Sequence, residues 1–281
     1  DLFAPTAFEA TSPPADLVQD RAFFGIGWAA MHSDIANPEN DLFLIFKSSP
    51  YGSVSHSYAD QNTYVIMKGG AALASLSGAY YPSYGAPFHA EYTRQTMSKN
   101  GILVNGEGQI VRSGRARGRL TDFRSMKHIA YVCGDAQEAY GEKLDRFFRH
   151  VLFIKPSLIV IADDLEAPGA ATYQWLLQGK EAFELDEANQ GLMSRRKEQE
   201  MHVRLFSEGG FAFLQTDEWP LAPETGFPTA REGRRGYPKK QWHFTAETRQ
   251  EAKARRIAAV MFVPDKATGA TAMPTIEQPA P

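Results

Sequence analysis

Short apolar runs separated by turn residues recur along most of this sequence, and their recurrence limits the folds that the chain can adopt. The runs are apolar or alternating, and Gly, Asn, Ser or Pro residues bound them, which is typical of β-strands. The clearest runs are residues 41–49, 62–68, 101–108, 172–179, 201–207, 211–216, 240–247 and 255–264. They follow one another at intervals of roughly 8–15 residues, without the alternation of strands and helices that builds parallel sheets. The pattern predicts an all-β fold, a large antiparallel β-sandwich.

One hairpin can be placed in detail. Two apolar runs, Phe147–Ile154 and Leu158–Ala162, flank a Lys-Pro-Ser sequence. Because Pro156 has a fixed φ angle and no N–H to donate to a neighbouring strand, it favours a turn between two antiparallel strands. We expect Asp163-Asp164 to end the second strand. Helical patterns are scarce, and the best of them, residues 249–256, could equally form a charged loop.

The size and composition of the chain agree with a globular protein and exclude several classes of function. Its 281 residues are 43% hydrophobic and 22% charged, enough for one large β domain or two ordinary domains. The net charge of −3 provides no overall attraction to nucleic acid or an anionic membrane, so an anion site would have to be local. The single cysteine, Cys133, rules out an internal disulfide and a cysteine-based zinc site.

The two ends of the chain differ from its middle. Residues 1–20 are rich in Pro, Ala and acidic residues, and the end of the sequence, TAMPTIEQPAP, has no strand pattern. We therefore expect a linker over residues 1–20, the sandwich over residues 21–265 and a tail over residues 266–281. This organisation suggests a piece of a longer protein.

The sequence HSYAD places His56, Tyr58 and Asp60 at two-residue intervals. On a β-strand these three side chains would share one face and could converge on one point. Such a group could bind a metal ion, transfer protons or only mark the polar entrance of a strand, and tyrosine is a poor ligand for zinc. The residues alone leave these three interpretations open.

Aromatic and hydrogen-bonding residues crowd the later segment 77–101, SGAYYPSYGAPFHAEYTRQTMSKNG. A solvated connection seldom carries so many tyrosines, because exposed aromatic surface is unfavourable without a partner. Such rings can stack on the faces of sugars, while Arg, Asn and Gln side chains bind hydroxyl and carboxylate groups. The segment therefore favours carbohydrate binding, and an Ω-like loop packed on its own rings is the alternative.

Both segments belong to longer strings that resemble the C-terminal domain of the heparinase II/III-like polysaccharide lyases, closest to the oligoalginate-lyase-like branch. The strings H-S-x-A-D-Q-N and Y-x-R-Q-T-x-x-x-N are specific when they occur together, as they do here. The resemblance rests on residues 23–34, 46–62, 78–109 and 147–165. It is close over residues 20–165 and weaker beyond them.

The resemblance implies an architecture and a reaction. In such lyases an N-terminal (α/α) toroid precedes the β-sandwich and the cleft runs between them, so this chain would be the second half and the toroid a missing partner. The reaction is β-elimination at a uronic acid of an acidic polysaccharide or oligosaccharide. The carboxylate is neutralised, a base removes the C5 proton and an acid protonates the departing O4. His56 matches the cleft histidine of the family, which helps to neutralise the carboxylate or assists the base.

The resemblance also implies which side chains of this chain contact substrate. The acid, the base and the carboxylate clamp usually lie on the toroid. The segment 77–101 lends the family a substrate-contacting tyrosine, which could here be Tyr84 or Tyr92. The substrate-binding residues expected on this chain are Gln61, Tyr84, Tyr92, Arg94, Gln95 and Asn100.

One departure from the family concerns a structural zinc site. Relatives that hold zinc carry a histidine where this sequence has Tyr58, an aspartate in the stretch where it has Leu76, and a histidine near the position of Lys99, although relatives with lysine there also exist. All three replacements remove good zinc donors, and Leu76 and Lys99 would disfavour a dication in that pocket. We predict no metal and no cofactor, with the Lys99 ammonium holding the loop where the metal charge would otherwise lie.

We therefore predict the β-sandwich part of a polysaccharide lyase, a carbon–oxygen lyase acting on a uronate-containing glycan, with alginate-type oligosaccharides favoured over heparin or heparan. The chain alone should lack the full catalytic set. The alternatives from other classes are a non-catalytic carbohydrate-binding sandwich and a scaffold for a partner half. The substrate class suggests the periplasm, or the cytoplasm for a member that trims oligosaccharides. Neither nucleic acid nor a membrane is an expected partner.

Overall fold

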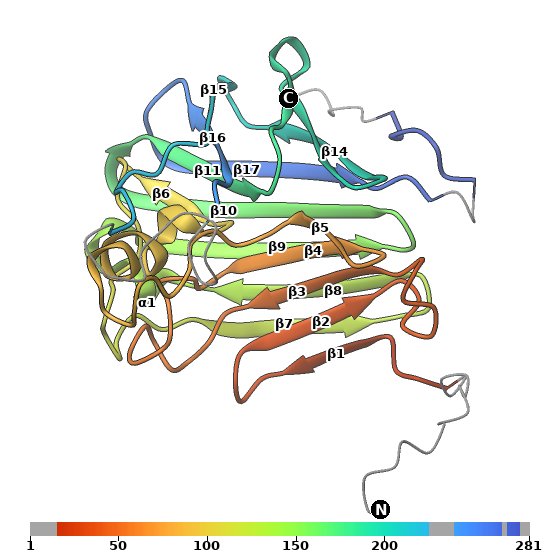
Figure 1. Cartoon of the computed structure of the whole chain (residues 1–281), viewed down its shortest axis with the longest axis horizontal. Helices are drawn as coiled ribbons and strands as arrows, with labels where there is room; N and C mark the ends of the chain where they lie inside the picture. Colours follow the sequence, from red (N-terminus) through yellow and green to blue (C-terminus); the bar gives the residue numbers. More distant parts are fainter. Residues whose placement is uncertain (1–15, 225–238, 266–268, 276–281) are drawn as a thin grey trace, which may run out of the picture.

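Strands with one buried face make up most of the computed structural model, which describes residues 16–224, 239–265 and 269–275. The strands form three antiparallel sheets, as Figure 1 shows. The first sheet holds five strands in chain order: β1 (Asp20–Phe23), β2 (Trp28–His32), β3 (Leu42–Lys47), β4 (Thr63–Lys68) and β5 (Ala71–Ala74). The predicted all-β, antiparallel fold class is confirmed.

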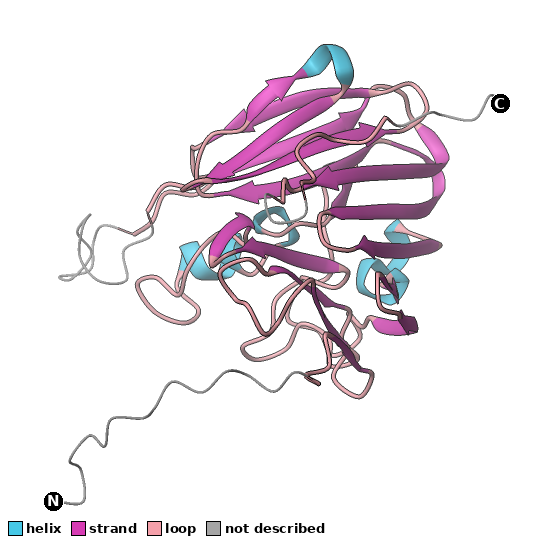
Figure 2. Cartoon of the chain, turned by 90° about the vertical axis from the view of Figure 1, so that its right-hand side faces the viewer, coloured by secondary structure: helices cyan, strands magenta, loops and turns pink. Residues whose placement is uncertain are grey.

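The other two sheets combine segments that are distant in sequence. The second sheet has eight strands, in the spatial order β12 (Glu184–Asp186), β13 (Gly191–Arg196), β14 (Gln199–Phe206), β17 (Ala252–Phe262), β10 (Leu158–Ala171), β9 (Arg146–Ile154), β8 (Ile129–Asp135) and β7 (Arg119–Ser125). The third has four strands, in the order β15 (Phe211–Thr216), β16 (Trp242–Thr248), β11 (Tyr173–Gly179) and β6 (Ile102–Val104). Over the described residues, Figure 2 shows helix only as short turns: η1 (His89–Thr93), η2 (Thr96–Ser98), α1 (Gln137–Tyr140), η3 (Gly141–Lys143) and η4 (Glu187–Asn189).

Alternation along the strands explains how the sheets pack. In β9 every second residue is buried, including Phe147, Val151 and Phe153. One large core combines such residues with Phe46 of the five-stranded sheet and Trp175 of the four-stranded sheet, and in Figure 1 the five-stranded sheet lies across the eight-stranded one. Each fully buried side chain of this size contributes about 1.5–3 kcal/mol. The core therefore fixes the sheets against one another.

The predicted hairpin is confirmed, with one correction. β9 and β10 pair directly on either side of residues 155–157. The prediction that Asp163-Asp164 ends the second strand is wrong, because β10 continues to Ala171. Asp163 instead lies in the core, 2% exposed, beside the buried Arg149 of β9. The neighbouring cation offsets the penalty that an isolated carboxylate would carry there.

The helix considered for residues 249–256 does not form. Arg249 and Gln250 lie in a bend, and β17 begins at Ala252. β17 pairs with β10 along most of its length. The hydrogen bonds and apolar contacts of this central pairing outweigh the weak helical preference of a charged segment.

Two long loops at one end of the five-stranded sheet position the candidate site. The first loop, residues 48–62, connects β3 to β4, and the second loop, residues 75–101, connects β5 to β6. Both gather at the left-hand end of the molecule in Figure 1. The prediction that His56, Tyr58 and Asp60 share one strand face is wrong, because the first loop is built of turns and bends.

Parts of the expected linker and tail, residues 1–15, 266–268 and 276–281, lie outside the described residues. The named strands of the described part run from Asp20 to Phe262. Within that part, no helix is long and apolar enough to cross a membrane.

Candidate functional site

The two loops lie against each other. The backbone N–H of Ala59 donates to the carbonyl oxygen of Arg94 at 2.9 Å, and Thr96 Oγ1 donates to the Ala59 carbonyl at 3.0 Å. The Gln61 N–H donates to Gln109 Oε1 at 2.9 Å, and Gln109 Nε2 donates to the Gln61 carbonyl at 2.8 Å. The two bonds of Ala59 bring the HSYAD segment beside the tyrosine-rich segment, and those of Gln61 anchor the end of the first loop to Gln109, which follows β6.

His56 is exposed and stands among tyrosines of the second loop. Its Nδ1 atom lies 3.3 Å from the Tyr80 hydroxyl oxygen, and its ring centroid lies 4.6 Å from that of Tyr84. Tyr80 and Tyr84 are 43% and 47% exposed. The structure thus places a titratable imidazole and two phenol rings on one accessible surface, which can bind oxygen-rich ligands and exchange protons with them.

Arg94 holds Tyr84 in this arrangement. The Arg94 guanidinium is buried, and it donates from Nη1 to the Tyr84 hydroxyl and from Nη2 to the Ser53 carbonyl, each at 2.8 Å. The Tyr84 hydroxyl in turn donates to the Ser55 carbonyl at 2.5 Å. Because both serines precede His56 in the first loop, Arg94 and Tyr84 also fix the backbone that carries His56.

His89 is a second imidazole at the site, and its only signal in the sequence was a place among the tyrosines. It lies in the π-helical turn η1, is fully buried, and stacks on Tyr80 with 4.5 Å between ring centroids and an interplanar angle of 23°. Its Nδ1 accepts the Gly85 N–H at 3.0 Å, so the neutral ring carries its proton on Nε2, which has no hydrogen-bond partner among the described residues. Burial lowers the pKa of His89, and the charges of Arg94 and Lys99 lower it further.

Tyr58 and Lys99, which the family resemblance places at two positions of an expected zinc site, contact each other. Lys99 Nζ lies 4.4 Å from the centroid of the Tyr58 ring and donates to the Thr93 carbonyl at 2.7 Å. An ammonium, a phenol and the alkyl side chain of Leu76 make no donor set for zinc. The described residues contain no group of three His, Cys, Asp or Glu side chains able to hold a metal ion. These residues do not fit the zinc that the family resemblance implies.

Asn100 and Gln61, both expected to contact substrate, are buried and bonded within the protein. The Asn100 side-chain amide donates to the carbonyls of Tyr64 and Ser75 at 2.7 and 3.1 Å, and its Oδ1 accepts the Gln178 N–H at 2.8 Å. It thereby joins β4, the second loop and β11. Gln61 is 1% exposed; its side chain accepts the Ser49 N–H at 2.6 Å and donates to the carbonyls of Gly52 and Ala116, each at 3.3 Å. Both side chains hold the loops in place.

Tyr92 and Gln95 are the remaining residues that were expected to contact substrate. Tyr92 is buried in a small aromatic cluster with Phe88. Of the two tyrosines that the sequence left open, Tyr84 is the one that the structure places beside His56. Gln95 is half-buried, and its side-chain amide donates to a backbone carbonyl of η1 at 3.1 Å.

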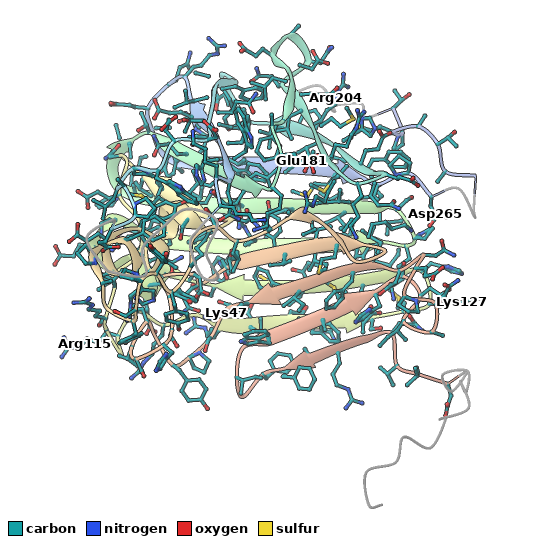
Figure 3. The ribbon with its side chains drawn as sticks, viewed as in Figure 1. Lys47, Arg115, Lys127, Glu181, Arg204 and Asp265 are labelled. Atoms are coloured by element: carbon teal, nitrogen blue, oxygen red, sulfur yellow. The ribbon has the colours of Figure 1, made fainter. Side chains whose placement is uncertain are left out.

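The charges that act on the buried His89 ring are chiefly positive, although the net charge of the chain is −3. The charged groups that act most strongly on the His89 ring are Arg94, Lys99, Arg112 and, when protonated, His56. Lys47 ends β3 on the same side of the molecule, where Figure 3 labels it, and its charge is paired with the Asp60 carboxylate. A local excess of positive charge suits an anionic ligand.

Known proteins share this fold. The family described as heparinase II/III-like, C-terminal, matches residues 16–267. A solved structure of heparinase III, the BT4657 gene product, superposes with a TM-score of 0.71 at 15% sequence identity, covering 89% of this chain and 37% of that one. Heparan sulfate lyase HepC from Pedobacter heparinus gives a TM-score of 0.70 at 15% identity, with 92% and 38% covered. At this identity the likeness concerns the fold, and this chain spans less than two-fifths of either protein. No curated protein matches the sequence.

Proposed function

This chain belongs to the heparinase II/III-like C-terminal family, and from that premise we propose that it forms one wall of a polysaccharide lyase that cleaves a uronate-containing glycan by β-elimination. The observation that carries the proposal is the exposed His56 imidazole in contact with Tyr80 and Tyr84. Two buried cations, Arg94 and Lys99, lie behind this surface and favour an acidic ligand.

β-Elimination requires three functions at the sugar ring. The uronate carboxylate must be neutralised to acidify the C5 proton, a base must remove that proton, and an acid must protonate the departing O4. In this proposal His56 binds the carboxylate or assists the base, because the contact with Tyr80 occupies Nδ1 and leaves the Nε2 edge for a ligand. A protonated imidazole would form a charge-assisted hydrogen bond to the carboxylate. Tyr84 would offer its ring to a sugar face.

The remaining acid and base are proposed to lie on polypeptide outside this chain. The Tyr84 hydroxyl is already engaged by Arg94 and Ser55. Burial raises the pKa of Tyr58, and its hydrogen bond to Tyr80 raises it further, so a phenolate base is not available there near neutral pH. We therefore expect little lyase activity from the chain alone.

An exposed apolar rim beside the site is the proposed contact for the rest of the lyase, a helical toroid. The rim consists of Phe24, Ile26, Trp28, Tyr51 and Val54, which are 41–61% exposed. Its two segments adjoin, since the Ser48 N–H donates to the Gly27 carbonyl at 2.7 Å, and Val54 is two residues from His56. Exposed apolar side chains that adjoin one another favour an interaction site, and the related lyases are more than twice as long as this chain.

Alginate-type oligosaccharides are the proposed substrate class, because the two loop sequences resemble the oligoalginate-lyase-like branch. The alternative is a heparan-type glycan, the class for which HepC is named. The two classes differ in sulfation, so parallel titrations with alginate oligosaccharides and heparan sulfate oligosaccharides distinguish them. A periplasmic location is proposed with either substrate class.

Binding and activity assays on the same preparations test the proposal. We expect alginate oligosaccharide to bind the chain, and we expect His56→Ala to weaken binding about tenfold through loss of a hydrogen bond to a charged group. His128→Ala, at an exposed histidine between β7 and β8, is the matched control. Absorbance of an unsaturated uronate should rise only when the chain is joined to polypeptide that supplies the second wall. Equal affinity of the two variants, or full lyase activity of the chain alone, would contradict the proposal.

A non-catalytic carbohydrate-binding role is the second candidate, and a separate hollow favours it. The hollow, of about 800 Å³, lies on the eight-stranded sheet and is lined in part by His150, Phe206 and Arg256. An aromatic ring beside an imidazole and a guanidinium can hold a sugar without performing chemistry. Glycan binding that perturbs this hollow and leaves His56 unchanged would favour the binding module, and no glycan binding would favour a scaffold.

A further inference from the structure

We infer that Lys99 is a positioning residue for His56 and acts through Tyr58 and Tyr80. The consequence for catalysis rests on the proposed function, whereas the effect on the orientation of His56 rests on the contacts alone. Lys99 carries a fully buried charge that does not touch the ligand surface.

The surroundings of Lys99 are unusual for a lysine. Its side chain is 1% exposed. Its Nζ donates to the Thr93 carbonyl at 2.7 Å and faces the Tyr58 ring at 4.4 Å from the centroid. The structure gives it no salt bridge within the described residues, since the nearby Asp60 carboxylate is paired with Lys47. Among the described residues, its close partners are therefore one carbonyl and one ring face.

An ammonium in such surroundings is unfavourable for folding by itself. Burial lowers the pKa of Lys99 to about 8; the Asp60 charge raises it and the Lys47 charge lowers it again. A buried charge without an ion-pair partner carries an uncompensated desolvation cost. What the ammonium does supply is a directed attraction to the face of the Tyr58 ring. We attribute to this attraction the placement of Tyr58 between the two loops.

Tyr58 connects to His56 through Tyr80. The Tyr58 and Tyr80 rings pack with 6.3 Å between their centroids, and the Tyr80 side chain contributes to the raised pKa of Tyr58. The Tyr80 hydroxyl in turn lies 3.3 Å from His56 Nδ1. The Tyr80 ring is also stacked on the buried His89, which limits its freedom. With Nδ1 engaged by a hydroxyl, the orientation of the imidazole and its free Nε2 edge are both set. Each contact restricts the next, from the buried ammonium to the exposed histidine.

The family resemblance implies a site in which a zinc ion supplies the positive charge. In this chain a lysine side chain supplies it. The side chains at two of the expected ligand positions, Tyr58 and Lys99, contact each other. The charge belongs to Lys99 itself, whose Nζ is bonded to the end of η1 at Thr93. Lys99 thus joins the two loops at the position of the expected zinc site, where the side chains present do not fit a metal.

NMR spectroscopy of the purified chain tests the inference without an assay of lyase activity. The imidazole resonances of His56, assigned with His56→Gln, are compared in the wild type, Lys99→Met, Tyr58→Phe and the control Lys127→Met. Methionine keeps an apolar side chain without the charge, and phenylalanine keeps the ring but lacks the hydroxyl whose pKa the Tyr80 side chain raises. Lys127 is exposed and lies at the opposite end of the molecule in Figure 3.

We expect the His56 resonances to move in Lys99→Met and in Tyr58→Phe and to stay in place in Lys127→Met. Affinity for alginate oligosaccharide should fall about tenfold in the first two variants, as for loss of one charged hydrogen bond. Unchanged His56 resonances in a folded Lys99→Met variant would overturn the inference. If that variant does not fold, Tyr58→Phe decides in the same way. A wild-type chain that binds no glycan would count against the proposed function, while the resonance comparison would still accept or reject the role of Lys99.

Discussion

Arg149 and Asp163 form a buried ion pair between the two central strands β9 and β10. Arg149 Nε lies 2.6 Å from Asp163 Oδ1, and Nη2 lies 2.8 Å from Oδ2. The remaining nitrogen, Nη1, donates to the carbonyls of Asn62 and Asn100 at 2.7 and 2.8 Å. One guanidinium thus connects the eight-stranded sheet to the ends of both loops that build the candidate site.

Loss of this pair should be far more destabilising than loss of a neighbouring ion pair. Asp163→Asn leaves a buried guanidinium uncompensated, and we expect it to lower the free energy of unfolding by about 3–5 kcal/mol. Asp164→Asn is the matched control, because Asp164 follows on the same strand but is half-buried and pairs with Arg146. We expect Asp164→Asn to lower the free energy of unfolding by less than about 1 kcal/mol. Urea unfolding of both variants measures the difference, and equal losses would contradict the assignment.

Lys99 should make the stability of the protein depend on pH in alkaline solution. Its pKa is about 8 in the folded protein, against the ordinary lysine value of 10.5. Between these values the unfolded chain therefore binds more protons than the folded chain. The free energy of unfolding therefore rises with pH across this window, on the order of 1 kcal/mol per pH unit for one proton. Lys99→Met removes this contribution. Urea unfolding of the wild type and Lys99→Met at several pH values should give diverging curves, and parallel curves would exclude the effect.

The site should not require zinc. We expect purified protein to contain no stoichiometric zinc, and we expect a chelator to leave the melting temperature unchanged, because Tyr58, Leu76 and Lys99 provide no donor set. A triple variant, Tyr58→His with Leu76→Asp and Lys99→His, restores the donor types implied by the family resemblance and should gain zinc-dependent stabilisation. Elemental analysis that finds about one zinc per wild-type chain would refute the prediction.

The apolar rim should contribute to stability and activity only when the rest of a longer lyase is present. Phe24→Ser combined with Trp28→Ser should leave the stability of the chain alone nearly unchanged, because both side chains are about half exposed. In the longer polypeptide the same changes should lower the unfolding temperature and the lyase activity. Leu214→Ser is the control, since Leu214 is 64% exposed on β15. No difference between the rim variant and this control in the longer protein would argue against the interface.

Those parts of the fold that depend on local signals could be predicted from the sequence. Pro156 between two apolar runs placed the hairpin of β9 and β10, and alternation placed β3, β4 and β16. Strands such as β7 were not predicted, because their sequences are largely polar and their pairing with a neighbour defines them. Asp163 was read as a strand end because its partner, Arg149, is identified only by the pairing of β9 with β10.

The candidate site was predictable in its position and not in its internal contacts. The two loop sequences indicated that His56 would lie near the tyrosines, and the structure places it beside Tyr80 and Tyr84. The roles of the buried residues depend on long-range hydrogen bonds. Asn100, expected on the ligand surface, bonds to backbone atoms far away in the sequence. His89 has no pattern of its own, since its burial and stacking follow from the turn η1.

The central claim is that His56 and the tyrosines of the second loop form a surface that binds an acidic glycan. An NMR titration of the 281-residue chain with alginate oligosaccharide tests it most directly, because it locates the ligand without requiring catalysis. We expect saturable shifts in the resonances of His56, Tyr80 and Tyr84. Shifts confined to the hollow around His150 and Phe206, or none in the presence of the glycan, would contradict it.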